Sequence, residues 1–536
     1  MKKNVTGMSF RDLIEREAAL SADKPLLYMG SRAFRLKEIN DMADNMAQEL
    51  SALGVKRGTH VGLCGTNTAR WVAAFFAIQK LGAICVLMNP ALLPKEIAEY
   101  SSIGEVTYLC CGKSRFSDDE EGYIEAIRQS EHNAVSYFYN IEKEIKGVEG
   151  GKESEFRPQP DDPAIMLFTS GSTARPKCAL LSSYSVLVSA TESMKSQLLT
   201  ENDRTCLILP LFHVFGIVAG LFANILAGSV MYLPEDMHTA TLIDTIERYE
   251  CTVFHAVPTM MLMLISSKEF LPERLKSVRC TILSGAAATK EQIELFQKNL
   301  PNDHFLSAYG LSESAPVSTL PYGDTLENCI TTVGKPMDHI KVRIVDIETG
   351  RDCMPGQKGE IIVKGVNLMT AYYKVRIEDQ SIDGEGWLHT GDLGCLREDG
   401  YLCFLGRLKE LIIRGGENIM PQDVAAAVST LKQVKDVKVV AVPSDFYGEE
   451  VCACIILRPG TEFDSESAKK ELKEKIAGFK IPSYFLIYEE FPVLATGKVD
   501  MVSLKKDAAA LAFAAPEWNA DSPCDTWQID RKSSEC

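Results

Sequence analysis

Short apolar runs alternate with longer, helix-length apolar segments over the first half of the chain. The clearest pairs are HVGLCG (60–65) with TARWVAAFFAIQKLG (68–82), CLILPL (206–211) with FGIVAGLFANILAG (215–228), and TVFHAV (252–257) with PTMMLMLISS (258–267). A strand-length run followed by a helix-length segment is typical of βα units, whose strands pair in parallel. The pattern predicts an α/β fold, with a large N-terminal domain of sheets layered with helices.

From about residue 333 the apolar segments are shorter and are separated by glycines and charged turns, as in KVRIVD (341–346) and GYLCFLGR (400–407). Such segments predict a smaller, more antiparallel β subdomain over about 333–408. Near Leu411 a third pattern begins, in which strand-like runs alternate with ESAKKELKEKIAGF (466–479). We expect a compact α+β module there, of ordinary domain size.

The segment GRLKELIIRGGENI (406–419) joins these last two parts and is short, charged and glycine-bearing. A domain can rotate about one or two residues that absorb the change in backbone angles. We therefore expect an N-terminal domain at 1–408 and a small, mobile C-terminal domain at 409–505, with its hinge at Lys409. The remaining segment, 506–536, is small and polar, which predicts a loosely attached tail.

Composition narrows the class of protein. A chain of 536 residues exceeds a single hydrophobic core, and its formal charge of −16 disfavours a broad nucleic-acid surface. No run reaches the roughly 18 apolar residues of a transmembrane helix, and the start of the chain shows no signal-peptide pattern. We expect a cytoplasmic protein, in which the 16 scattered cysteines are reduced core residues.

One segment, MLFTSGSTARPK (166–177), opens from an apolar run into a hydroxyl- and glycine-rich loop. Backbone amides and hydroxyls in such a loop can surround an anion, and the lysine adds a positive charge. The candidate phosphate-binding residues are Thr169, Ser170, Gly171, Ser172, Thr173 and Lys177. The loop lacks the Walker spacing, and an ordinary surface turn is the alternative interpretation.

Further segments place single functional residue types in distinctive settings. They are LPLFHVFG with His213, AYGLSES with Tyr309 and Glu313, GWLHTGDLG with Asp392, and LATGKVD with Lys498. Each segment alone has a structural interpretation: a packed histidine, a solvated glutamate, an aspartate in a turn, or an exposed lysine. Only the joint occurrence of these segments favours a functional interpretation over the structural ones.

Taken in order, these segments and the hinge segment resemble the motifs of the adenylate-forming superfamily, which comprises acyl-CoA synthetases, luciferases and peptide-synthetase adenylation domains. The resemblance covers about residues 8–503. It implies two half-reactions. A carboxylate attacks the α-phosphate of ATP to give acyl-AMP and pyrophosphate, and a thiol, usually that of coenzyme A, then displaces AMP.

The resemblance also implies roles for residues of the N-terminal domain. The loop at 169–177 would hold the β- and γ-phosphates, and Glu313, with Ser312 beside it, would hold Mg²⁺. Tyr309 would lie on the adenine, with Gly310 next to it in the nucleotide site. Asp392 would accept hydrogen bonds from the ribose hydroxyls, and Arg407 would orient ribose or phosphate.

For catalysis and domain movement, the resemblance implies that Lys498 is the principal cation at the α-phosphate and the acyl oxygen. Rotation about Lys409 would withdraw Lys498 after adenylation and present the Gly415-Gly416 turn to the pantetheine thiol. His213 would lie at the acyl pocket as a gate or positioning residue.

The chain departs from the family pattern in the phosphate loop, where Ala174 and Cys178 stand at positions that are usually glycine. If either position needs a positive φ, the side chain costs about 1 kcal/mol. Cys178, next to Lys177, is either a reactive thiol or a buried inert one.

We expect an AMP-forming acyl-CoA synthetase that uses ATP, Mg²⁺ and coenzyme A. Small residues in SGAAA (284–288) and FGIVAG (215–220) favour a medium- or long-chain fatty acid or a bulky aryl acid, although small residues also permit close packing. The alternatives are an acyl-AMP ligase that loads a carrier protein and a nucleotide-binding pseudoenzyme.

Overall fold

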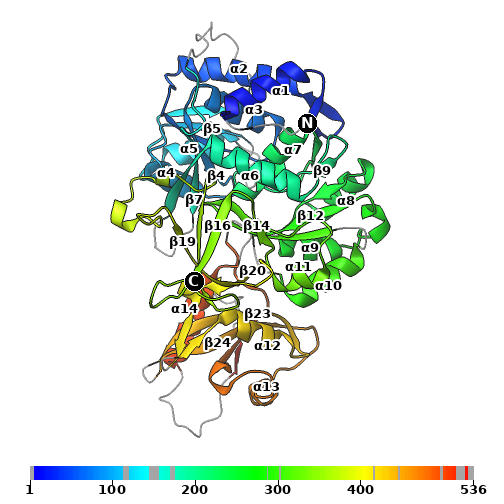
Figure 1. Cartoon of the computed structure of the whole chain (residues 1–536), viewed down its shortest axis with the longest axis vertical. Coiled ribbons are helices and arrows are strands. Elements are labelled where there is room, and N and C mark those ends of the chain that lie inside the picture. The colour runs from blue at the N-terminus through cyan, green and yellow to red at the C-terminus, as the bar shows by residue number, and fades with distance from the viewer. Residues whose placement is uncertain are drawn as a thin grey trace.

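The protein is described by a computed structural model that covers residues 5, 7–112, 120–143, 156–169, 176–285, 288–300, 304–414, 417–444, 447–494, 499–514 and 526–528. Figure 1 shows a large N-terminal domain, coloured blue to green, and a smaller C-terminal domain in yellow and orange at one end of the molecule. The predicted α/β fold with these two parts is confirmed. Within the described ranges, no helix is both long and apolar enough for a bilayer crossing.

The first sheet of the N-terminal domain has the strand order β18-β8-β7-β4-β3-β5-β6. Its strands are β3 (His60–Cys64), β4 (Ile84–Met88), β5 (Tyr108–Cys111), β6 (Tyr137–Asn140), β7 (Pro163–Thr169), β8 (Lys177–Ser182) and β18 (Ala371–Tyr372). Strands β3 to β7 pair in parallel, as their apolar pattern predicts, and β8 and β18 add antiparallel strands at one edge. The start of β8 and the end of β7 therefore lie side by side.

The second sheet has the order β15-β14-β13-β12-β11-β9-β10-β1-β2. Its strands are β1 (Pro25–Met29), β2 (Arg32–Arg35), β9 (Arg204–Cys206), β10 (Val230–Leu233), β11 (Val253–Phe254), β12 (Cys280–Leu283), β13 (His304–Leu311), β14 (Ala315–Thr319) and β15 (Lys335–Pro336). The central strands are parallel, and β13 and β14 form an antiparallel hairpin near one edge. This hairpin carries the AYGLSES segment.

Helices connect and cover these strands. They are α1 (Phe10–Leu20), α2 (Leu36–Ala52), α3 (Ala69–Lys80), α4 (Pro94–Ile103), α5 (Glu120–Arg128), α6 (Ser183–Ser196), α7 (Ala223–Ala227), α8 (Thr239–Arg248), α9 (Pro258–Ile265), α10 (Lys290–Asn299) and α11 (Leu326–Thr331). Every residue of helix α3 except Arg70 is buried, which explains its apolar sequence. Phe10 of α1 stacks on Phe222 at a ring-centroid distance of 4.5 Å, and Phe75 of α3 meets both rings edge-on.

The predicted β subdomain contains an antiparallel sheet of β16 (Ile340–Val345), β17 (Gly359–Gly365), β19 (Leu388–Leu396) and β20 (Leu402–Arg407). Two other strands of the 333–408 segment, β15 and β18, pair instead with the sheets of the N-terminal domain. The subdomain is consequently tied to both larger sheets, and this brings its residues next to those of β8 and β13.

The C-terminal domain contains β21 (Ile412–Arg414), β22 (Glu417–Ile419), α12 (Pro421–Ser429), β23 (Val434–Ser444), β24 (Gly448–Leu457), α13 (Ser465–Leu472), β25 (Tyr484–Tyr488), α14 (Met501–Ala514) and β26 (Thr526–Gln528). It has its own core, which includes Ile412, Val424 and Phe485. Helix α14 runs across residue 506, and β26 pairs with β25, so parts of the expected tail belong to regular elements of this domain. The domain limits at 408 and 505 remain predictions.

Candidate functional site

Tyr309 and Asp392 meet between the second sheet and the β subdomain. Tyr309 lies on β13 and Asp392 on β19, and the tyrosine hydroxyl donates a hydrogen bond of 2.6 Å to Asp392 Oδ2. Both side chains are buried, and Asp392 is only 1% exposed. Phe404 of β20 packs against the tyrosine ring at a centroid distance of 5.6 Å. A flat aromatic surface thus borders a fixed carboxylate.

The other carboxylate oxygen of Asp392, Oδ1, has weaker interactions. Arg407 faces Asp392 across β19 and β20, and its Nε lies 3.3 Å from Oδ1. The geometry of that contact does not make a hydrogen bond, and within the described part of the chain Oδ1 is buried without a hydrogen-bond partner. Buried polar atoms are normally hydrogen-bonded, so this oxygen is suited to accept a donor from a ligand.

Burial controls the ionisation of this pair. Removal from water raises the pKa of Asp392 to about 6, although the Tyr309 hydroxyl and the Arg407 charge act in the opposite direction. The pKa of Tyr309 lies well above its ordinary value because of burial and the adjacent carboxylate. Tyr309 therefore remains a neutral hydrogen-bond donor, and Asp392 is an ionised acceptor at neutral pH.

The β13–β14 hairpin carries Gly310, Ser312 and Glu313. A Cβ at Gly310 would stand 2.4 Å from the carbonyl oxygen of Ala315, so the tight hairpin requires glycine there. Ala315 itself has a φ of 53°, a left-handed conformation that an L-residue adopts at some cost. Ser312 and Glu313, both half-buried, occupy the hairpin turn.

Contacts from the segment before β18 hold this turn. The Met369 amide donates 2.7 Å to the Glu313 carbonyl, and the Asn367 side chain donates to the carbonyl of Ser314 and, at 3.3 Å, to that of Pro316. Asn367 is buried, so these bonds are shielded from water. Asn367 was missed by sequence reasoning, because an asparagine in a loop gives no signal of a contact so distant in the chain.

Tyr372 contacts both Glu313 and Lys177. The Tyr372 hydroxyl donates 2.7 Å to Glu313 Oε1, and Lys177 Nζ lies 4.7 Å above the centre of the same ring. Lys177 Nζ also donates 3.3 Å to the backbone carbonyl of Asp379. Tyr372 was also missed, since its partners lie in segments that only the fold brings to β18.

The base of the predicted phosphate loop is well placed for an anion. Thr169 ends β7 directly opposite Lys177 at the start of β8. The Thr169 hydroxyl is buried and has no hydrogen-bond partner among the described residues. The loop residues Ser170, Gly171, Ser172 and Thr173 lie outside the described part of the chain. Lys177 and the Thr169 hydroxyl thus lie at the two ends of the predicted loop.

His213 lies in a bend that follows β9. The strand predicted at 206–211 ends at Cys206, because Asn67 holds the following residues in a bend: its side chain donates 2.8 Å to the Leu209 carbonyl and accepts 3.0 Å from the Leu211 amide. The next helix begins with a π-helical turn, Gly216–Phe222, and the exposed His213 ring packs against Phe212 at 4.3 Å. His213 is at the surface rather than packed in the core.

The remaining predicted residues are at or beyond the domain junction. Lys498, Gly415 and Gly416, and the side chain of the expected hinge Lys409, lie outside the described residues. Nearby, a Cβ at Gly406 would come within 2.6 Å of Met420 and Gln422, the residues that lead into α12. Gly406 therefore permits the close approach of the C-terminal domain to β20 in this conformation.

Of the two departures from the family pattern, Ala174 lies outside the described residues and Cys178 has a structural explanation. Cys178 is buried in the first sheet, and burial raises the pKa of its thiol to about 12, which favours the inert interpretation. Ser182 caps α6, because its hydroxyl accepts from the Ser185 amide at 3.1 Å.

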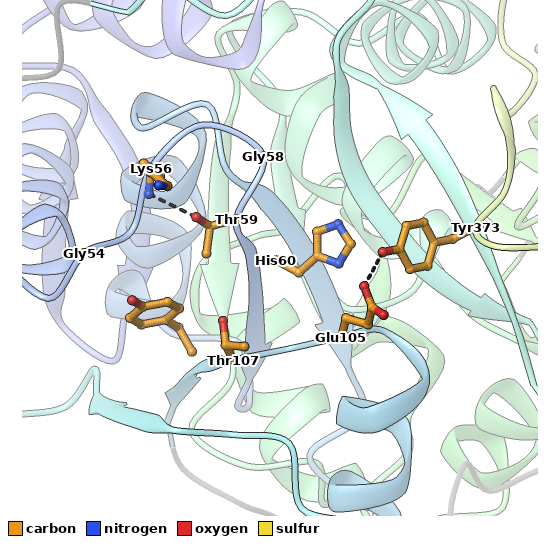
Figure 2. A pocket seen from close by; sticks show the side chains of 9 residues that line it. Gly54, Lys56, Gly58, Thr59, His60, Glu105, Thr107 and Tyr373 are labelled. Carbon is orange, nitrogen blue, oxygen red and sulfur yellow. Dashed lines mark hydrogen bonds between the residues drawn. The ribbon is translucent and has the colours of Figure 1, made fainter.

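A hollow of about 440 Å³ lies at the amino ends of β3 and β5, next to Tyr373 (Figure 2). It is lined by Gly54, Lys56, Gly58, Thr59, His60, Glu105, Thr107, Tyr108 and Tyr373. None of the predicted site residues is among them. In open α/β sheets ligands bind at the carboxyl ends of the strands, which is where Thr169 lies. We therefore assign the candidate site to the Tyr309, Asp392, Glu313 and Lys177 cluster.

Comparisons with known proteins test the predicted family. The family model described as AMP-binding enzyme matches residues 14–373, and the model of the AMP-binding enzyme C-terminal domain matches 423–498. The putative acyl-CoA synthetase YngI of Bacillus subtilis is 28% identical, over 92% of this chain and 96% of its own. The mitochondrial medium-chain acyl-CoA ligase ACSF2 of Danio rerio is 30% identical, over 86% of this chain and 82% of its own.

Solved structures give the same result. The o-succinylbenzoate CoA synthetase MenE of Bacillus subtilis, in complex with the acyl-adenylate OSB-AMP, superposes with a TM-score of 0.80 at 28% identity and covers 92% of this chain and 97% of that one. ATP-bound MatB of Rhodopseudomonas palustris superposes with a TM-score of 0.84 at 22% identity, over 94% of this chain and 100% of that one, and shares the fold. The predicted enzyme class, an AMP-forming acid–thiol ligase, is confirmed. The chain belongs to the AMP-binding enzyme family.

Proposed function

We propose that this enzyme activates a medium- or long-chain fatty acid, or a bulky aryl acid, and transfers the acyl group to coenzyme A. In the first half-reaction a carboxylate oxygen bonds to the α-phosphorus of ATP, and pyrophosphate leaves. In the second, the thiol sulfur bonds to the acyl carbon, and AMP leaves. The observation that carries the proposal is the buried Asp392 carboxylate, held by Tyr309 with one oxygen lacking a hydrogen bond within the described residues.

The nucleoside would bind where Tyr309, Phe404 and Asp392 converge. An aromatic face gives a purine base a stacking surface, and a buried carboxylate gives the two ribose hydroxyls a strong acceptor. Hydrogen bonds from these hydroxyls would satisfy Asp392 Oδ1 and offset part of the cost of its burial. Arg407, whose guanidinium is half exposed, would orient ribose or phosphate.

The phosphates would bind at the Lys177 end of the site, with the loop 170–175 around them. Lys177 supplies a cation and Thr169 a hydroxyl. Glu313 and the Ser312 hydroxyl supply hard oxygen donors, which fit Mg²⁺, an ion often bound by one or two carboxylates together with substrate phosphates. Bound Mg²⁺ would neutralise charge on the polyphosphate. Fixed charges of this kind lower the barrier because they are oriented before the reaction.

Lys498 would supply the further cation that stabilises charge developing at the α-phosphate. In this proposal it is carried into place by the C-terminal domain and is withdrawn by rotation about Lys409. The Gly415-Gly416 turn would then line the path of the pantetheine thiol. His213, exposed next to Phe212, would position or gate the acyl group between the two half-reactions.

The class of acid is supported by the relatives at 28–30% identity. They include a protein named as a medium-chain acyl-CoA ligase and one named as an o-succinylbenzoate CoA synthetase, so an alkyl and an aryl acid are both represented. Gly216 and Gly220, among the small residues after His213, serve close packing: a Cβ would stand 2.1 Å from the Pro210 carbonyl oxygen at Gly216 and 2.5 Å from Leu207 at Gly220. These two glycines therefore give no evidence of extra room for the acyl group.

A panel of acids tests the proposal, with acid-dependent ATP–pyrophosphate exchange measured first and thioester formation with added coenzyme A second. We expect both activities with medium-chain, long-chain or aryl acids, and little with acetate. Exchange without thioester would favour transfer to a carrier protein. Loss of both with every acid, while ATP still binds, would favour the pseudoenzyme.

A further inference from the structure

Strand β18 and the turn after it place two neighbouring tyrosines against two different glutamates. The Tyr372 hydroxyl, at the end of the strand, donates to Glu313 in the candidate site, and the Tyr373 hydroxyl, in the turn, donates 2.6 Å to Glu105 at the hollow shown in Figure 2. The two adjacent tyrosines therefore reach different partners.

The backbone of Tyr372 is held at several points. Tyr372 pairs with Ala179 of β8, its amide donates 2.8 Å to the Gln380 side chain, and its carbonyl accepts 3.0 Å from the same side chain. Gln380 also donates 2.8 Å to the Val375 carbonyl, which closes the turn after β18. The ring is 7% exposed. The hydroxyl therefore has a fixed position before any ligand binds.

The hydroxyl and the ring of Tyr372 serve different partners. The hydroxyl donates a hydrogen bond of 2.7 Å to Glu313 Oε1. The ring face receives the Lys177 ammonium at 4.7 Å, an attractive cation–π distance. Among the described residues Lys177 and Glu313 form no ion pair with each other, so neither charge is cancelled by the other.

We propose that Tyr372 is a positioning residue that orients the Glu313 carboxylate toward Mg²⁺ with its hydroxyl and the Lys177 ammonium toward the phosphates with its ring. This inference rests on the proposed function, because the roles of Glu313 and Lys177 are part of it. Groups that orient a metal ligand commonly change metal affinity 10- to 100-fold when they are removed. Tyr372 would act through Glu313 and Lys177 and would not touch the reacting atoms.

Two substitutions separate the two contacts. Tyr372→Phe removes the hydroxyl and keeps the ring, whereas Tyr372→Leu removes both. Tyr373→Phe and Tyr373→Leu are the matched controls, since that tyrosine directly follows strand β18 and has an equivalent bond to a glutamate. Equilibrium binding of ATP, with Mg²⁺ and in the presence of a chelator, is measured by calorimetry for each full-length variant, alongside the thermal unfolding midpoint.

Tyr372→Phe is expected to weaken binding of Mg²⁺–ATP about tenfold and to leave metal-free ATP within about twofold. Tyr372→Leu should in addition weaken metal-free ATP about threefold or more, because Lys177 loses its cation–π contact. The half-saturating Mg²⁺ concentration for pyrophosphate exchange should rise in parallel. Both Tyr373 variants should bind ATP like the unmodified protein under both conditions.

The proposal is overturned if Tyr372→Phe leaves Mg²⁺–ATP binding unchanged, or if it weakens metal-free ATP equally, since the hydroxyl would then have no metal-specific effect. It is also overturned if the Tyr373 variants give the same losses, because the effect would then come from the strand. Absence of acid-dependent exchange in the unmodified protein would count against the proposed function alone, and the binding comparison would still decide the role of Tyr372.

Discussion

Tyr372 and Tyr373 organise two similar clusters with different charge balance. Around Tyr373, Lys374 forms a direct ion pair with Glu105 and lies 5.7 Å from the centre of the tyrosine ring. Around Tyr372, Lys177 lies over the ring and Glu313 on the hydroxyl, with no ion pair between them in the described structure. Each cluster has one tyrosine, one glutamate and one lysine. Only in the Tyr373 cluster do the lysine and the glutamate neutralise each other.

We interpret the Tyr373 cluster as structural and propose that the Tyr372 cluster is a ligand site, although the two share a composition. An internal ion pair near the surface contributes little to stability and leaves little charge for a ligand. Separated charges cost more to hold, and they remain available for a phosphate or a metal ion. A substitution that removes charge from the Tyr372 cluster should therefore affect activity, whereas its counterpart in the Tyr373 cluster should not.

The largest expected effect tests whether Lys177 and Glu313 can support adenylation without Lys498 of the C-terminal domain. Lys498→Ala should lower ATP–pyrophosphate exchange about 10³-fold, because charge at the α-phosphate would lose its stabilising partner. Thioester formation from supplied acyl-AMP should stay within about threefold, because that step would use the other domain orientation. Lys505→Ala, at an exposed position of α14, is the control. Equal loss of both half-reactions would contradict the two-orientation model.

The glutamates give the next largest contrast. Glu313→Gln should lower kcat for exchange about 10²-fold, since a neutral amide is a poor Mg²⁺ ligand. Glu105→Gln should leave kcat within about twofold, because that carboxylate is engaged by Lys374 and Tyr373. Steady-state exchange kinetics at several Mg²⁺ concentrations measure both. A similar loss in the two variants would remove the distinction between the clusters.

The lysines should differ in KM rather than in stability. Lys177→Met is expected to raise KM for ATP about tenfold, the usual size of a lost charged hydrogen bond. Lys374→Met removes a partly exposed pair and should change the free energy of unfolding by less than about 1 kcal/mol, with KM unaffected. Chemical denaturation and initial rates on the same samples provide both quantities. An unchanged KM in Lys177→Met would exclude that lysine from the phosphate site.

The carboxylate of Asp392 should make nucleotide binding and stability respond to pH in opposite ways. Its pKa is raised to about 6 in the folded protein, above the unfolded value, so the native state gains stability as the pH falls through about 6. The ionised form at neutral pH costs up to ~3 kcal/mol. Asp392→Asn should therefore stabilise the free protein at pH 7, by about 1–3 kcal/mol, and flatten this pH dependence.

Nucleotide affinity should move the other way. A protonated or amidated side chain is a weaker acceptor for ribose hydroxyls, so ATP affinity should decline below about pH 6 and in Asp392→Asn. Denaturation curves and calorimetric ATP titrations between about pH 5 and pH 8 check both trends. A variant that is destabilised at neutral pH, or that binds ATP normally, would contradict the view of Asp392 as a buried acceptor awaiting its ligand.

The smallest effect concerns Cys178. This residue follows Lys177 in the chain, and its backbone carbonyl accepts a hydrogen bond from the Tyr373 amide. Its burial and its raised pKa predict slow alkylation compared with the half-buried Cys353. Peptide mass spectrometry after brief treatment of the native protein measures both sites. Rapid labelling of Cys178 that ATP prevents would restore the reactive-thiol interpretation.

Much of the fold was readable from the sequence, because burial on both faces demands continuous apolar strands and an amphipathic or apolar helix after each. The predictions at 60–65 and 68–82 correspond to β3 and α3. The prediction at 206–211 was wrong beyond Cys206, because Asn67, far away in the chain, bonds to the backbone there and bends it. Apolar content alone does not distinguish a buried strand from a buried bend.

The sequence by itself determined the layered α/β fold, the separate C-terminal module and the residues that resemble the family motifs, because these follow from local patterns of side-chain type. Only the tertiary structure decided which of those residues meet. Tyr309 and Asp392 are hydrogen-bonded across 83 positions, and Glu313 and Tyr372 across 59. The pKa values of Tyr309 and Asp392 depend on burial, and the partners of all four residues depend on strand register. Neither property is contained in a short segment of sequence.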